Sequence, residues 1–94
     1  MCQIILSLFK WDESTDPKEW WIHDVVAEAD SIGKADKFAS ELADAYGRIA
    51  STFANLHGCH GFAFDVVKDE HAVASYEIDM SGRIEFWCED ECHE

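Results

Sequence analysis

The stretch KADKFASELADAYGRIASTFANL, residues 34–56, decides the fold of this chain. Its apolar residues recur at steps of three and four, the spacing that places side chains on one face of an α-helix. Gly58 follows at the position typical of a helix C-terminal cap. The stretch therefore predicts one long amphipathic helix. We expect these side chains of its apolar face to pack on a sheet: Phe38, Leu42, Tyr46, Ile49 and Phe53.

Segments typical of β-strands lie on both sides of this helix. Residues 3–11 and 19–29 are rich in β-branched and aromatic side chains and predict a hairpin with an acidic turn at residues 12–17. After the helix, residues 62–67, 72–80 and 84–88 alternate with a period of two and are joined by short turns. These segments predict an antiparallel meander.

The order of these segments, β-β-α-β-β-β, predicts a two-layer α+β domain. In this fold one long helix packs on an antiparallel sheet of about five strands. We expect residues 1–94 to form a single domain that ends in a short acidic tail at residues 89–94. One face of the sheet is then left for water or for a partner.

The charge of the chain is strongly unbalanced. Twenty Asp and Glu face seven Lys and Arg, which gives a formal net charge of −13, although 48% of the residues are hydrophobic. A compact acidic surface repels nucleic acid and membranes and attracts basic protein surfaces. The start of the chain resembles a strand and not an export signal. We therefore expect a cytoplasmic protein with reduced cysteines and a basic protein partner, without direct binding to nucleic acid or to a membrane.

Carboxylates on the last strands are the first candidate site. Asp65, Glu77, Asp79 and Glu85 alternate with apolar residues and are predicted to point away from the helix. Alternate residues of a strand lie about 6.8 Å apart and neighbouring strands about 4.8 Å apart, so these carboxylates would form a lattice. Such a lattice could imitate the charge of a nucleic-acid backbone. The alternative is an acidic face that is solvated and raises solubility.

Two further features extend this candidate partner-binding site. Asp12, Glu13 and Asp16 form a second acidic cluster in the predicted turn. Trp87 is predicted to lie on the open face of the sheet beside Glu85. An exposed Trp among carboxylates is typical of a protein-binding hot spot. A Trp packed under a loop or the tail is the alternative.

The Cys and His residues are a candidate metal site. His57, Cys59, Cys88 and Cys92 could ligate zinc tetrahedrally if the third strand starts near the place where the fifth ends. Their spacing matches no standard zinc finger, so the prediction is free cysteines, no metal and no cofactor. A disulfide from Cys59 to Cys88 or to Cys92 is a further alternative.

Motifs of catalysis are absent from the sequence. There is no G-x-S-x-G, no glycine-rich phosphate loop, no H-E-x-x-H and no calcium-binding loop. The acidic residues beside His71 fall on a predicted surface turn. We therefore expect that the protein is not an enzyme.

In size, charge and single α+β domain, the chain is similar to the small acidic proteins that phages and mobile elements use against host defence, including anti-CRISPR proteins and DNA mimics. The resemblance implies an inhibitor that occupies the basic groove of a nucleic-acid-handling complex in a bacterial host. It also implies that Asp65, Glu77, Asp79 and Glu85 carry the phosphate-like charge. Two other classes stay open: a housekeeping interaction subunit, with a homodimer among the assemblies, and a small zinc-binding domain that uses the Cys and His residues.

Overall fold

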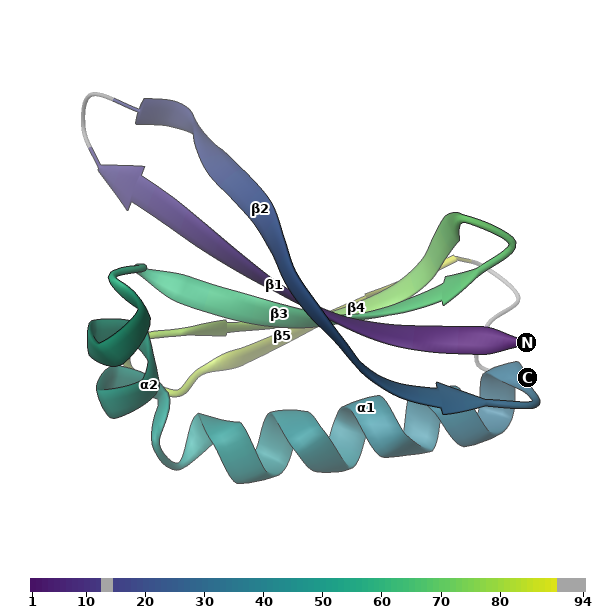
Figure 1. Ribbon diagram of the computed structural model, residues 1–94. Coiled ribbons are helices and arrows are strands. Elements are labelled where there is room, and N and C mark those ends of the chain that lie inside the picture. The colour runs from purple at the N-terminus through teal and green to yellow at the C-terminus, as the bar shows by residue number, and fades with distance from the viewer. Residues whose placement is uncertain (13–14, 90–94) are drawn as a thin grey trace.

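The computed structural model describes residues 1–12 and 15–89, and for residues 11–18 it describes the backbone only. Its elements are β1 (Cys2–Asp12), β2 (Thr15–Ala29), α1 (Ile32–Gly47), α2 (Ala50–His57), β3 (Gly61–Lys68), β4 (His71–Asp79) and β5 (Ile84–Cys88). The helices lie on one side of the sheet (Figure 1). The expected α+β class, with one antiparallel sheet of five strands, is confirmed.

The strands are arranged in the order β2-β1-β3-β4-β5. β1 therefore lies inside the sheet, between β2 and β3, and pairs with a neighbour along both of its edges. β2 and β5 form the two edges. The last three strands form the predicted meander. β1 and β2 form the predicted hairpin, which reaches beyond the other strands at one end (Figure 1).

The prediction of one long helix is wrong, because the helical segment divides at residues 48–49. α1 ends at Gly47, and Ile49, with φ of −122° and ψ of 23°, has left the helical conformation. The carbonyl of Gly47 faces Gly82 in the turn between β4 and β5, where an added Cβ would lie 2.6 Å from that oxygen. The apolar period continues through the break because it reports which residues are apolar and not whether the backbone hydrogen bonds are continuous.

The helices contact the sheet mainly through alanines. Five of these are buried: Ala35, Ala39 and Ala43 of α1, and Ala50 and Ala54 of α2. Small side chains let the helix backbones lie close to the sheet, whose own large residues, such as Phe62 and Phe64, fill the core.

This arrangement corrects part of the predicted apolar face. Leu42, Tyr46 and Phe53 are partly buried against the core, as expected. Phe38 and Ile49 are instead 42% and 51% exposed. The alanine face is turned toward the sheet, and the larger side chains therefore lie along its borders or in solvent.

The acidic turn predicted at residues 12–17 is shorter than expected. β1 continues to Asp12, β2 begins at Thr15, and these two residues pair with each other. Asp16 and Pro17 therefore belong to β2, where proline is tolerated because β2 is an edge strand.

Candidate protein-binding face

The open face of the sheet, opposite the helices, carries the four predicted carboxylates. Glu77 pairs with Ala63 and Glu85, Asp65 pairs with Ile5 and Ser75, and Asp79 pairs with Gly61. The residues between them in sequence, such as Phe64, Tyr76 and Ile78, belong to the helix-facing side. Tyr76 shows which side of the sheet faces the helix, because its hydroxyl donates a hydrogen bond to Asp36 of α1 at 2.8 Å.

Asp65 is held by serines from both neighbouring strands. The hydroxyl of Ser7 on β1 donates to one carboxylate oxygen at 3.1 Å, and that of Ser75 on β4 donates to the other at 2.7 Å. Ser7 is 6% exposed, and this bond satisfies its buried hydroxyl. These bonds fix the position of the half-buried Asp65 carboxylate on the open face.

Asp79 builds the turn between β4 and β5. One of its carboxylate oxygens accepts from the Ser81 hydroxyl at 2.5 Å and from the backbone N–H groups of Ser81 at 2.9 Å and Arg83 at 3.1 Å. The Ser81 hydroxyl is the main cause that lowers the pKa of Asp79 from its usual value, with smaller contributions from the two N–H groups and the Arg83 charge. Asp79 is therefore both a structural residue and a fixed negative charge, and the sequence reasoning had not foreseen its structural role.

Glu77 and Glu85 lie directly opposite each other on β4 and β5. Together with Asp79 and Arg83 they line a small hollow of about 80 Å³. Two carboxylates in directly opposed positions repel each other and destabilise the strand pair. Among the described residues that line this hollow, Arg83 is the one cation, and Glu77 and Glu85 are a directly opposed pair of like charges.

Trp87 lies on the same open face and is 52% exposed. In the register of the sheet it is opposite Ser75, the serine that donates to Asp65. The exposed indole is thus one strand away from the serine and two strands away from the carboxylate. The structure brings Trp87 and the four carboxylates onto one surface that spans β3, β4 and β5.

The other half of the open face is apolar. Trp20, Ile22 and Val25 of β2 are exposed there. Beside Trp20, the ring of Phe9 is buried, with the two ring centroids 4.8 Å apart. Phe9 covers Gly61, where an added Cβ would lie 2.2 Å from its ring. The aromatic and β-branched content of residues 19–29 was the sequence signal for this apolar surface. The sequence could not show which of these side chains share a face, because the pairing of β2 with β1 contains irregularities.

The second predicted acidic cluster is only partly described. Asp12 ends β1 and Asp16 lies near the start of β2, at the end of the hairpin away from the turn between β2 and α1 (Figure 1). Glu13 lies outside the described residues, and so does Cys92 of the proposed metal site.

The structure does not bring Cys59 and Cys88 together. Cys59 precedes Gly61, which pairs with Asp79, whereas Cys88 pairs with Ala74, five residues away along β4. At roughly 3.4 Å per residue, this separation is about 17 Å. In an antiparallel meander the third strand starts beside the start of the fifth and not beside its end, so the geometry that the zinc site and the Cys59–Cys88 disulfide required is absent.

Within residues 1–12 and 15–89, no three His, Cys, Asp or Glu side chains are grouped so that they could hold a metal ion. Cys59 is buried, and this burial raises the pKa of its thiol. His57 instead packs its ring against Phe53 and against His23 of β2. The Nε2 of His71 contacts a carboxylate oxygen of Glu89, and this contact connects the start of β4 to the residue after β5.

No protein-family model matches the chain, and no curated protein sequence or solved structure is significantly similar to it. None of the helices in the described residues has the length and apolar character that crossing a bilayer requires.

Proposed function

We propose that this protein binds a basic, nucleic-acid-binding surface of a larger protein through the open face of its sheet and thereby inhibits that protein. The proposal includes a bacterial host cytoplasm as its place of action, as for small acidic anti-defence proteins. The observation that carries it is the placement of Glu77 and Glu85 directly opposite each other on the face of the sheet that lies away from the helices. Two directly opposed carboxylates concentrate negative charge at one place on this face. A cationic partner would be attracted by both carboxylates.

The fixed carboxylates support the same proposal. Asp65 and Asp79 are each held by hydrogen bonds, so a partner would not have to order them. Trp87, which lies two residues after Glu85 on β5 and on the same face, would add an apolar anchor. Complementary charge raises the rate of encounter, and an aromatic anchor lowers the rate of release.

The test compares variants that change the charge without disturbing the turn. Asp79 stays unchanged because it accepts three hydrogen bonds there. The protein is used as bait in an extract of the organism that carries the gene, and captured proteins are identified by mass spectrometry. The purified partner is then titrated with the parent, with E85K, with E77K/E85K and with W87A, at low and high salt. D44K, a charge reversal at an exposed position of α1, is the matched control for E85K.

We expect E85K and E77K/E85K to slow association, W87A to speed dissociation, and D44K to bind as the parent does. We also expect the parent to displace nucleic acid from the partner, and binding to weaken as salt rises. A folded E77K/E85K variant that binds the partner as tightly as the parent at low salt would show that the acidic face is only a solvated surface. A partner whose binding to nucleic acid is unchanged in the complex would refute the inhibitory part.

A further inference from the structure

β2 is a long edge strand with unusually many exposed apolar side chains. It has 15 residues, and within the described sheet it pairs with β1 alone. Its exposed large side chains, between 37% and 70% exposed, are Trp20, Trp21, Ile22, Val25 and Val26. An edge strand has a row of outward backbone N–H and C=O groups, which is the feature to which extended segments of other chains add as a further strand.

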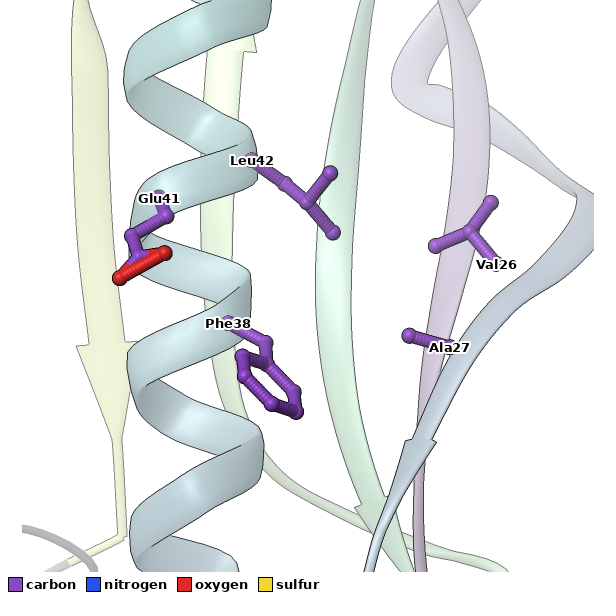
Figure 2. A pocket seen from close by; sticks show the side chains of 5 residues that line it. All are labelled: Val26, Ala27, Phe38, Glu41 and Leu42. Atoms are coloured by element: carbon purple, nitrogen blue, oxygen red, sulfur yellow. The ribbon is translucent and has the colours of Figure 1, made fainter.

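An apolar groove lies beside this edge, between β2 and α1. Figure 2 shows Phe38 and Leu42 pointing from the helix toward the strand, where Val26 and Ala27 form the opposite wall. The groove has a volume of about 290 Å³, and its fifth lining residue is Glu41. This volume is close to the lower limit for small-molecule pockets, which have volumes of roughly 300–1,000 Å³. The groove therefore has room for one or two side chains and not for a packed helix.

The groove continues into a second hollow with charged residues. Phe38 lines both, and the second hollow extends to Glu28, Asp30 and Lys34. Lys34 already forms an ion pair with Asp30 at 3.1 Å. Glu28 on the strand and Glu41 on the helix are exposed lining residues of the two hollows, and Figure 2 shows the carboxylate of Glu41 directed away from Val26 and Ala27.

We propose that β2 and this groove bind an extended cationic segment of another protein. The segment adds as a strand beside β2, inserts an apolar side chain between Phe38 and Val26, and places Lys or Arg near Glu28 and Glu41. The charge decides between occupants. A second copy of this chain would bring its own net charge of −13 and the same carboxylates to the contact, whereas a cationic segment is complementary.

This surface differs from the acidic face of the proposed function. The carboxylate pair Glu77 and Glu85 lies at the other edge of the sheet, on β4 and β5, and three strands separate β2 from β5. Variants at one surface therefore leave the other intact, and each proposal can fail without the other.

The probe for the test is an acetylated peptide of alternating lysine and valine, about ten residues long, with one central phenylalanine. It is titrated into isotope-labelled protein at moderate salt, and amide chemical shifts and the heat of binding are measured. The control peptide has the same charge, but prolines replace two of its valines so that it cannot pair as a strand. The protein variants are F38A and E28K/E41K, and E85K serves as the control at the opposite edge.

We expect shifts confined to β2 and α1, binding weakened about tenfold by F38A because an apolar contact is lost, and binding unaffected by E85K. Because Phe38 is 42% exposed, F38A should keep the melting temperature close to that of the parent, which shows that the loss is not unfolding. The proposal is overturned if the proline peptide binds equally well, if the shifts lie on β5, if the peptide does not bind, or if sedimentation shows a dimer of the parent that E28K/E41K strengthens.

Discussion

Reversal of one charge in the Glu77–Glu85 pair should stabilise the free protein. The two carboxylates are directly opposite on neighbouring strands. Opposite charges in such positions contribute roughly 0.2–1 kcal/mol, and like charges are destabilising. Exchange of repulsion for attraction in E85K should therefore raise the free energy of unfolding by about 0.5–1 kcal/mol. For a domain of this size, that corresponds to a rise of about 2–8 °C in the melting temperature.

The measurement is thermal and urea unfolding at low salt of the parent, E77K, E85K and E77K/E85K. The double variant restores a like-charge pair while its net charge is less negative than that of either single variant. It therefore separates the local pair from the overall charge of the chain. We expect each single variant to be more stable than the parent, and the double variant to lose this gain in stability. The difference should shrink in about 1 M salt, where screening acts over about 3 Å.

The reasoning is refuted if E85K melts at or below the temperature of the parent at low salt, or if E77K/E85K is as stable as E85K. The first result would mean that the two carboxylates do not repel each other in the folded state. The second would mean that any gain comes from the lower net charge. In the expected case E85K gains stability and loses the proposed binding, which is the signature of a residue kept for function at a cost in stability.

Further predictions concern the fold. G61A should lower the free energy of unfolding by about 1–3 kcal/mol or more in urea titrations, because the added Cβ would lie 2.2 Å from the Phe9 ring; an unchanged midpoint would show that Phe9 moves freely. E70G should raise the melting temperature, since Glu70 has a φ of 64° and relief of this left-handed conformation is worth about 1 kcal/mol. The stability difference between the parent and D79N should be largest above the ordinary carboxyl pKa of 3.8, because the folded pKa of Asp79 is lowered, and should disappear as pH falls through that lowered value; a difference that grows with acid in pH-dependent unfolding would contradict this sign. Cys59 should resist iodoacetamide in the native protein and react in urea, as read by mass spectrometry of its peptide, because burial shields the thiol and raises its pKa.

The sequence was most informative where local pattern and packing agree. The alternation after Gly61 located the last three strands and placed Glu77 and Glu85 on one face, because side-chain direction in a strand follows directly from position. The helical segment was located equally well. Its break at residues 48–49 was not predicted, and the close approach of Gly47 to Gly82, 35 residues later in the chain, could not be foreseen from local pattern.

Two features of the candidate site were also beyond local reasoning. The alternation shows that Asp79 points outward, but it does not show that the carboxylate turns back to the N–H groups of the next residues. The apolar half of the open face was hidden as well, since irregular pairing shifts which residues of β2 share a face. The separation of Cys59 from Cys88, in contrast, follows from the antiparallel meander that the sequence predicted, because β3 starts beside the start of β5 and not beside its end.

The contact between Gly47 and Gly82 also decides where this protein can be modified for experiments. Two backbones meet there without a side chain between them, so an insertion in the β4–β5 turn would separate the end of α1 from the sheet. The two-residue turn between Lys68 and His71 lies at the opposite end of β4, and its residues are exposed. A fluorophore or an affinity tag that replaces Asp69 would therefore leave the helix contact, the acidic face and the β2 edge available to partners.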